Sequence, residues 1–405
     1  MPTKLTRRVG RVLDPVAEFL RTEAAGGFLL LGFSIVALAW ANGPWSDAYF
    51  DLWATELTIG AGDVAISEDL GQWVNDALMA IFFFVISLEI KRELIVGDLR
   101  HPRAAALPIL AAIGGVLLPA SIYVAITWDT GATAGWGIPM ATDAAFAIGV
   151  LTLLGDRVST GAKLFLVTIA VVDDVIAILV IAFVYSGSIE LPWLAGAALG
   201  LLVVASMRRV PIVSPLAYVP IAVAIWVATL KSGIHPTIAG VALGLMTPAK
   251  PVRGREVLEE LEHRLHPVSA FLVLPAFALA NAGVEIGGDA LGSSTEVRLS
   301  IGVALWLVLG KLLGIGSMTW LALRTGVGRL PEGVGRRTAL GVAALGGIGF
   351  TVSLFIAPLA FSEPAFVDSA KLGILGGSVL SALVGIAILA GGPRSPTARE
   401  ADAGA

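Results

Sequence analysis

Long apolar runs alternate with short polar or glycine- and proline-rich segments along almost the whole chain. Runs of this length predict membrane-spanning helices, because a straight helix needs about 20 apolar residues to cross the hydrocarbon core. The pattern predicts an all-α polytopic membrane protein, with a single domain over residues 1–390 and a disordered cytoplasmic tail over 391–405. Its twelve spans are 25–41, 74–95, 104–126, 138–154, 161–185, 192–207, 212–230, 235–247, 268–281, 300–323, 337–361 and 368–390.

Composition and charge placement agree with this class. Hydrophobic residues make up 56% of the chain and charged residues 14%, whereas soluble domains have about 25% charged residues. Most Lys and Arg residues fall in the N-terminal segment, in alternate connections and in the tail, so both termini are expected in the cytoplasm. The chain has no cysteine and four scattered histidines, which exclude thiolate metal sites and disfavour a transition-metal centre. We expect the lipid bilayer as a partner, and neither a cofactor nor nucleic acid.

The longest polar connection, residues 42–72, carries six acidic residues and no Lys or Arg. This charge pattern predicts that the connection is external. Within it, residues 57–66 alternate around a glycine-containing turn and predict a small β-hairpin, with an unstructured loop as the alternative.

Four charged residues interrupt spans that are otherwise apolar: Asp143, Asp173, Asp174 and Lys311. A charge at the bilayer centre costs about 2.5–3.5 kcal/mol even on lenient scales, so such residues usually face a cavity or a partner and mark an ion or proton path. One lysine cannot neutralise three carboxylates, which disfavours a purely structural salt bridge. Neighbouring helical residues point about 100° apart, so Asp173 and Asp174 are expected to have different partners. One pairs with Lys311, and the other faces a water-filled funnel where it binds a proton or a monovalent cation.

Two spans are interrupted near their middles, the fourth at 137–149 and the eleventh at 341–353. They occupy equivalent central places in spans three to five and ten to twelve. This pattern is typical of inverted-topology repeats, in which two broken, crossing helices build a site at the midplane of the membrane. Because half-helix ends carry opposite partial charges, Asp143 and Lys311 can neutralise opposing ends.

Two other classes also place acidic residues in a membrane. An intramembrane aspartyl protease is matched formally by the string at 60–63, Gly-Ala-Gly-Asp, but this string lies in the acidic external loop. A passive cation channel needs symmetric rings of side chains or a carbonyl filter, which twelve non-repeating spans do not suggest. A transporter, not an enzyme, is therefore expected.

Short stretches throughout the chain resemble the NhaA family of sodium/proton antiporters. They follow the family order from span two to span twelve: 73–80, 88–93, 141–146, 172–175, 230–235, 261–267, 277–283, Lys311, 347–351 and 371–375. The resemblance implies electrogenic, pH-regulated exchange of cytoplasmic Na⁺ or Li⁺ for external H⁺ by alternating access in a bacterial inner membrane. It also implies a homodimer contact through the 57–66 hairpin.

The resemblance assigns roles to individual residues. Asp174 is expected to be the principal ligand of the transported cation and of the proton, with Asp173 as its partner. Asp173 and Lys311 form an ion pair that breaks when protons or cations bind. Asp143 and Thr142 are expected to belong to the same cation- and proton-binding site. Asp143 also balances the ends of the broken helices together with Lys311, and Thr142 adds a hydroxyl or carbonyl oxygen near the site.

Further polar residues are expected along the ion route or in the pH response. They are Asn75, Asp76, Glu89, Glu93, His235, Glu262, His263 and His266. Alternatives stay open, since Asp76 can cap an interfacial helix, Glu89 can pair with Arg92, and a lone histidine at a helix start is more often structural. Glu259 and Glu260 replace basic residues of the family, which leaves the pH of activation open.

Overall fold

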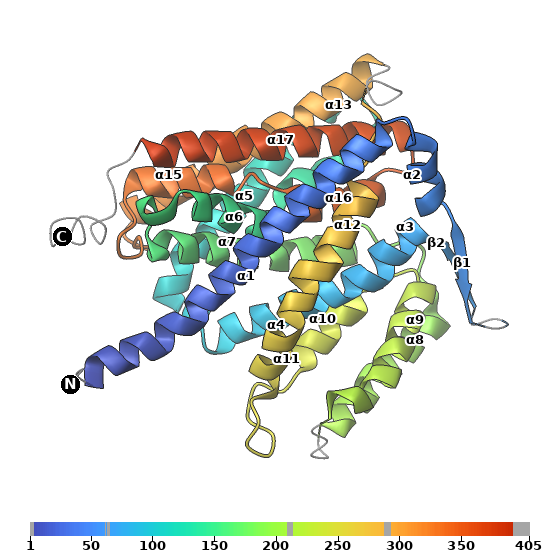
Figure 1. Ribbon diagram of the computed structural model, residues 1–405, viewed down its shortest axis with the longest axis horizontal. Helices are drawn as coiled ribbons and strands as arrows, with labels where there is room; N and C mark the ends of the chain where they lie inside the picture. The colour runs from blue at the N-terminus through green and yellow to red at the C-terminus, as the bar shows by residue number, and fades with distance from the viewer. Residues whose placement is uncertain (1–3, 61, 63–64, 209–213, 287–292, 392–405) are drawn as a thin grey trace.

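The computed structural model describes residues 4–60, 62, 65–208, 214–286 and 293–391, which form a bundle of helices (Figure 1). Six helices in this part of the chain are long and apolar enough to cross a membrane. They are α1 (Lys4–Ala41), α3–η2–α4 (Leu70–Trp73, Val74–Leu78, Met79–Ile95), α5 (Pro102–Thr127), α7 (Thr160–Phe183), α13–η9–α14 (Ser294–Leu305, Trp306–Gly310, Lys311–Arg324) and α17 (Pro364–Ala390). They match predicted spans one, two, three, five, ten and twelve, so the prediction of a helical membrane protein is confirmed.

Two further apolar spans are broken. The first consists of η4 (Thr133–Met140) and α6 (Ala144–Leu153), which meet at 43°, and the second of α15 (Arg336–Leu345) and α16 (Phe350–Ala360), which meet at 42°. Both breaks lie where the sequence predicted interruptions. At Gly347 only a glycine fits, because a Cβ there would collide with the carbonyl oxygen of Leu307. Counting each bent pair as one span gives eight.

Shorter apolar helices occupy the remaining predicted spans. They are α8 (Leu191–Met207), α9 (Val219–Lys231), α10 (Thr237–Met246), and the run of η7 (Ser269–Val273) and α12 (Leu274–Asn281), which follows α11 (Val257–Val268). Helices α8 and α9 form a pair at one side of the bundle (Figure 1). The remaining elements are α2 (Ser46–Trp53) and the 3-10 turns η3 (Asp98–Arg100), η5 (Gly155–Arg157) and η6 (Pro215–Ala217). The count of twelve spans stays a prediction.

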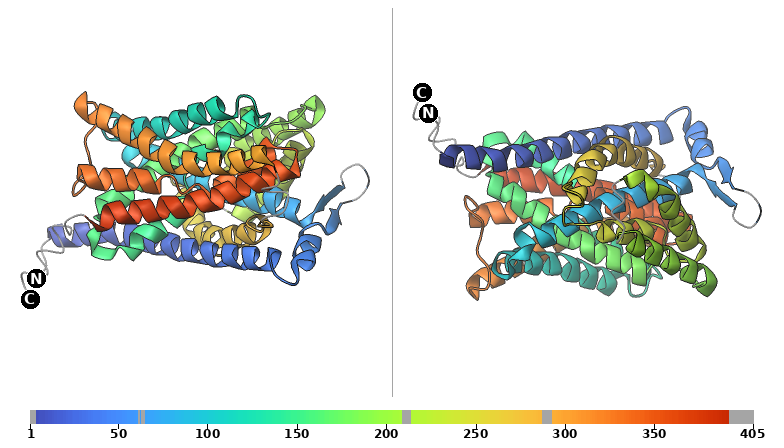
Figure 2. Two further views of the ribbon diagram at one scale, coloured as in Figure 1. Left: turned by 90° about the horizontal axis from the view of Figure 1, so that it is seen from above. Right: turned by 90° about the horizontal axis from the view of Figure 1, so that it is seen from below.

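An antiparallel strand pair extends from the end of the bundle opposite the start of α1 (Figures 1 and 2). Strand β1 (Glu56–Ile59) pairs with β2 (Ile66–Asp69), with Ile59 opposite Ile66. The second strand therefore begins where the predicted 57–66 hairpin ends. The connection is longer than a two-residue turn, since β1 ends at Ile59 and β2 begins at Ile66. Gly60 and Gly62 within it have positive φ angles, 120° and 56°. Asp63, the last residue of the protease-like string, lies outside the described residues, as does the tail from residue 392.

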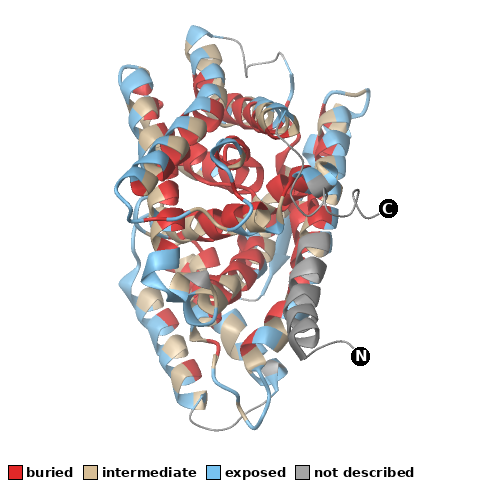
Figure 3. Cartoon of the chain, turned by 90° about the vertical axis from the view of Figure 1, so that its left-hand side faces the viewer, coloured by how far each residue is buried: buried red, intermediate tan, exposed pale blue. Residues whose placement is uncertain are grey.

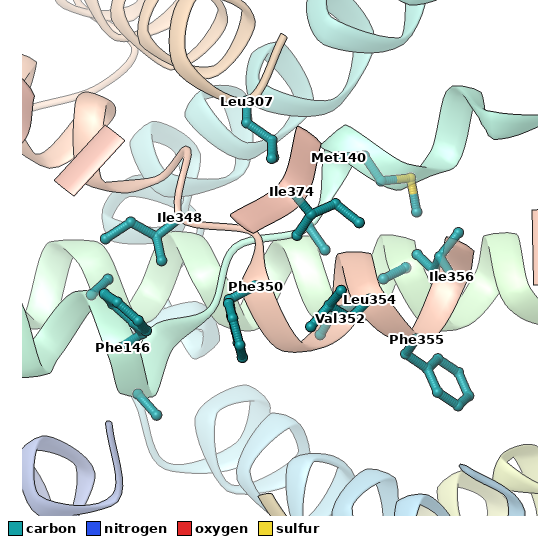
Figure 4. Packing of buried hydrophobic residues seen from close by; sticks show 14 of the residues in the cluster. Met140, Phe146, Leu307, Ile348, Phe350, Val352, Leu354, Phe355, Ile356 and Ile374 are labelled. Atoms are coloured by element: carbon teal, nitrogen blue, oxygen red, sulfur yellow. The ribbon is translucent and has the colours of Figure 1, made fainter. Parts of the chain in front are cut away.

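Buried side chains concentrate around the two breaks, while exposed residues cover the outside of the bundle (Figure 3). Phe146 from α6 and Phe350 from α16 pack with ring centroids 5.9 Å apart, and Ile348 lies near them in the same cluster (Figure 4). Large apolar side chains such as Phe183 are exposed on the outside, at 83% of the reference area. An apolar exterior around a tightly packed centre fits a helical bundle in lipid.

Candidate functional site

Asp143 accepts backbone hydrogen bonds from the first turns of α6 and α16, the second halves of the two broken spans. Its Oδ1 accepts the Phe146 N–H at 2.9 Å, which makes it the N-cap of α6, and its Oδ2 accepts the Thr351 N–H at 3.1 Å, in the first turn of α16. Its own N–H donates to the Ile348 carbonyl at 2.6 Å. One buried carboxylate thus lies at the positive ends of two helices, where it satisfies two backbone donors.

Lys311 and Asp173 form an ion pair beside the same crossing. Lys311 Nζ lies 2.6 Å from Asp173 Oδ2, and neither side chain is exposed. The Thr142 hydroxyl is 2.6 Å from Asp173 Oδ2, 2.8 Å from the Gly346 carbonyl and 3.2 Å from Lys311 Nζ. A hydroxyl has one proton, so Thr142 donates to one of these oxygens at a time while it accepts from Lys311.

One oxygen of this ion pair has no hydrogen-bond partner within the part of the chain that the structure describes. Asp173 Oδ1 is buried and accepts no hydrogen bond from the described residues. Leaving a buried acceptor unsatisfied costs about 1–3 kcal/mol, and more for a charged group. This oxygen is therefore available to a proton or a cation. We call Thr142, Asp143, Asp173 and Lys311 the crossing site.

Asp174 has different neighbours from Asp173, as predicted from helix geometry. It is partly exposed and lines a cavity of about 60 Å³, together with Thr142, Asp143 and Thr351 of the broken spans. Glu89 of α4 lines the same cavity. The cavity thus connects the crossing site to a second group of charged side chains.

This second group consists of Glu23, Glu89 and His266, and we call it the mouth cluster. His266 Nε2 lies 2.6 Å from Glu23 Oε1 and 3.6 Å from Glu89 Oε1, and all three residues line the cavity. Their possible ligand atoms lie within 4.8 Å of one another, so the three side chains can jointly hold a cation. The sequence analysis did not include Glu23. It could have been noticed as an acidic residue two positions before the first predicted span.

The cluster changes the titration of His266. Burial lowers the pKa of the imidazole, but the hydrogen bond to Glu23 and the negative charges of Glu23, Glu89 and Glu262 outweigh it and raise the pKa above its ordinary value. Nearby, Arg92 Nη1 lies 2.7 Å from Glu262 Oε1. Arg92 thus links α4 to α11, and its positive charge also acts on Glu89, so the alternative pairing of Arg92 with Glu89 stays open.

Asp76 and His235 meet towards the hairpin end of the bundle. Asp76 is 3% exposed, its Oδ2 accepts from Gln72 Nε2 at 3.2 Å, and its Oδ1 lies 3.4 Å from His235 Nε2. The interpretation of Asp76 as a helix cap is wrong, because Asp69 caps α3 by accepting the Gln72 N–H. Asp76 instead lies inside the π-turn η2, which turns its carboxylate into the bundle.

The other expected residues differ in their surroundings. Asn75 Oδ1 accepts from Asn281 Nδ2 at 2.8 Å. His263 is exposed and Glu93 is half-buried, and neither lines the cavity. Glu260 forms ion pairs with Arg255 and, at 2.6 Å, with Arg264. The residues in α11 that depart from the family pattern thus lie at its exposed start, away from the crossing site.

Two broken apolar spans that meet beside a buried lysine–aspartate pair are typical of secondary transporters. The profile of a family described as Na⁺/H⁺ antiporter 1 matches residues 17–389. The chain is 45% identical over 386 residues to the Na⁺/H⁺ antiporter NhaA 2 of Erythrobacter litoralis, over 95% of this chain and 96% of the relative. It is 44% identical over 372 residues to the Na⁺/H⁺ antiporter NhaA of Shigella dysenteriae, over 91% and 96% of the two chains.

The chain belongs to the Na⁺/H⁺ antiporter 1 family. The resemblance inferred from the short motifs is thereby confirmed. Members of this family are transporters whose ions are cargo, so the predicted class of a transporter holds and the protease and channel alternatives are wrong.

Proposed function

We propose that this protein exchanges cytoplasmic Na⁺ or Li⁺ for external H⁺ across a bacterial inner membrane, through twelve spans and with both termini in the cytoplasm. Family membership supports the exchange, and the basic residues concentrated in alternate connections support the orientation. The observation that carries the mechanism is the unsatisfied Oδ1 of Asp173, buried beside Lys311 and next to Asp174.

In this mechanism the proton and the cation compete for the same oxygens. Asp174 takes the principal role because it faces the cavity, and Asp173 Oδ1 and the Thr142 hydroxyl offer further oxygen ligands. Oxygen ligands suit a hard cation such as Na⁺ or Li⁺. A cation bound here repels the Lys311 ammonium and weakens its pair with Asp173, so binding is coupled to a change at the crossing of the two broken helices.

Two adjacent carboxylates also make the exchange electrogenic. If both Asp173 and Asp174 release protons for each cation bound, net charge crosses the membrane in every cycle. The membrane potential then contributes about 2.3 kcal/mol per charge per 100 mV. Asp143 keeps its place in this cycle, since its two oxygens accept backbone hydrogen bonds at two helix N-termini.

Side chains on either side of the crossing site line the route and set the pH response. Glu89, Glu93, Glu262, His263 and His266, joined by Glu23, belong to the cytoplasmic side, and Asn75, Asp76 and His235 to the external side. The support is the contact of the mouth cluster with the cavity and the Asp76–His235 contact towards the hairpin. The exposed strands β1 and β2 provide the homodimer contact, since Leu57 and Ile59 are 41% and 53% exposed there.

Reconstitution into proteoliposomes tests this proposal. Addition of Na⁺ to wild-type vesicles should drive proton movement, measured with an entrapped pH-sensitive dye, and Asp174→Asn should reduce it to background. The matched control is Asp129→Asn, because the Asp129 side chain is 71% exposed and does not line the cavity. Wild-type exchange by the Asp174→Asn variant, with normal folding, would reject the assignment.

A further inference from the structure

A groove opens on the outside of the bundle between α14 and α15. It has a volume of about 360 Å³, and Trp320, Leu323, Ala339 and Leu340 give it a largely apolar wall. Trp320 and Leu340 are 54% and 45% exposed, so this wall faces the surroundings of the protein and not the ion cavity. In a membrane such a groove accepts an apolar chain from the lipid.

The groove is positively charged where it meets the connection between α14 and α15. Arg324 is the last residue of α14 and Arg336 the first of α15, and both line the groove. No acidic side chain lines it, and no ion pair to either arginine occurs among the described residues. The Arg324 guanidinium lies 5.1 Å from the centre of the Trp320 ring, which keeps it beside the apolar wall.

The first turn of α15 adds to this positive charge. Its N-cap is Gly335, which offers no side-chain hydrogen bond to the first N–H groups of the helix. These donors and the helix dipole favour an anion at this end.

A buried hydroxyl at the groove also has no partner. Thr319 is 5% exposed, and its Oγ1 makes no hydrogen bond to the described part of the chain. Thr168 and Thr229, also in helices, donate to the carbonyl four residues earlier at 2.9 and 2.8 Å. Thr319 makes no such bond, so its hydroxyl is available to a polar atom inside the groove.

We propose that this groove binds an anionic phospholipid. The phosphate lies between Arg324 and Arg336 at the start of α15, one acyl chain follows Trp320 and Leu340, and Thr319 meets an ester oxygen. A free anion would leave the apolar wall uncovered, and a neutral lipid would leave two guanidinium groups without a counter-charge. Anionic lipid is also abundant on the cytoplasmic side of the membrane. The basic residues assign the connection between α14 and α15 to that side.

Lipid-dependent thermal stability tests the proposal on the purified full-length protein. Phosphatidylglycerol and phosphatidylcholine with the same acyl chains are titrated, and the apparent affinity is read from the unfolding midpoint. The wild type should prefer phosphatidylglycerol. In Arg324→Gln/Arg336→Gln the preference should fall by about fivefold for each arginine, since a basic side chain near a membrane surface contributes about 1 kcal/mol.

A matched double variant distinguishes this groove from the overall charge of the surface. Arg100→Gln/Arg103→Gln removes two charges from another connection assigned to the same side, and it should keep the preference. An equal loss in both double variants would overturn the proposal, because the preference would then come from total charge.

Two further measurements keep the proposal testable if the charge variant folds poorly. Gly316→Leu fills the groove without changing charge, since only Leu340 Cδ2, at 3.4 Å, lies near a Cβ at this position. It should weaken phosphatidylglycerol binding, and wild-type binding would contradict the groove. Inorganic phosphate should give no protection; protection equal to that of the lipid would indicate a simple anion site. None of these readouts depends on ion exchange.

Discussion

The two buried carboxylates at the helix crossing are held in opposite ways. Both oxygens of Asp143 accept backbone N–H groups, from Phe146 and Thr351, whereas Asp173 has one oxygen bound by Lys311 and Thr142 and one without a partner. Moving Asp143 would uncap two helices, whereas Asp173 lies within α7 and caps neither broken helix. Asp143 therefore stabilises the arrangement of the two broken helices, and Asp173 can take part in exchange.

The largest effect is expected when Asp173 loses its partner Lys311. Lys311→Ala leaves Asp173 without its counter-charge in a site with no exposure, so it should lower the free energy of unfolding by about 3–5 kcal/mol. Thermal unfolding in detergent measures the effect. Lys250→Ala, at an exposed position, should change little.

The double variant Lys311→Ala/Asp173→Ala sharpens the result. It removes both charges and should recover much of the lost stability. A double variant that is less stable than Lys311→Ala would show that the ion pair is not the source of the loss.

Neutralising Asp143 should affect stability more than exchange. Asp143→Asn keeps an oxygen acceptor but loses a negative charge at two helix N-termini, at a cost of about 2 kcal/mol. Exchange in proteoliposomes should remain measurable, in contrast to Asp174→Asn. If Asp143→Asn abolishes exchange while the unfolding midpoint is unchanged, the assignment of a structural role to Asp143 is wrong.

In the mouth cluster, the charge of His266 depends on pH. The pKa of His266 is raised in the folded protein, because its contacts with Glu23 and the neighbouring carboxylates outweigh burial. Its stabilisation is therefore fully present below the ordinary histidine pKa of about 6.5 and is lost as the pH rises through the folded value.

His266→Gln tests this sign. It should cost about 1.5 kcal/mol, the size of a charge-assisted hydrogen bond, at a pH below about 6.5, and progressively less at higher pH. Unfolding midpoints across a pH series measure the difference. His263→Gln is the control, since His263 lies on the same helix but is exposed. A difference that grows with pH would contradict the cluster's role.

These contacts show what the sequence can predict. The two breaks were predictable because glycines and Asp143 interrupt an apolar pattern, and the separate surroundings of Asp173 and Asp174 follow from helix geometry. The observed strands, 56–59 and 66–69, overlap the predicted 57–66 hairpin only in part, and that hairpin stays a prediction, because the alternating pattern does not reveal where each strand begins and ends.

The missing parts of the site depend on distant contacts. The bond from the Thr351 N–H to Asp143 joins residues 208 positions apart, and the pair of Glu23 with His266 joins residues 243 positions apart. A single sequence contains no pattern that links such positions. The π-turn at η2 also shifts the helical register, so the inward position of Asp76 could not be read from periodicity.

Glu260 forms ion pairs at the surface of the protein, where they should contribute least to the free energy of unfolding. Its carboxylate contacts Arg255 and Arg264, whose side chains are 44% and 65% exposed, and the hydrogen bond from Arg255 lowers the pKa of Glu260. The small stabilisation is therefore present above the ordinary glutamate pKa and is lost as the pH falls through the lower, folded value. Glu260→Gln should change the unfolding midpoint by less than His266→Gln does, as is usual for solvent-screened pairs. Differential scanning calorimetry at neutral pH measures this change at salt concentrations of about 0.02 M and about 0.4 M. The higher salt concentration should remove the difference in unfolding midpoint between the wild type and Glu260→Gln. A loss as large as that of Lys311→Ala would mean that burial does not set the cost of breaking an ion pair in this protein.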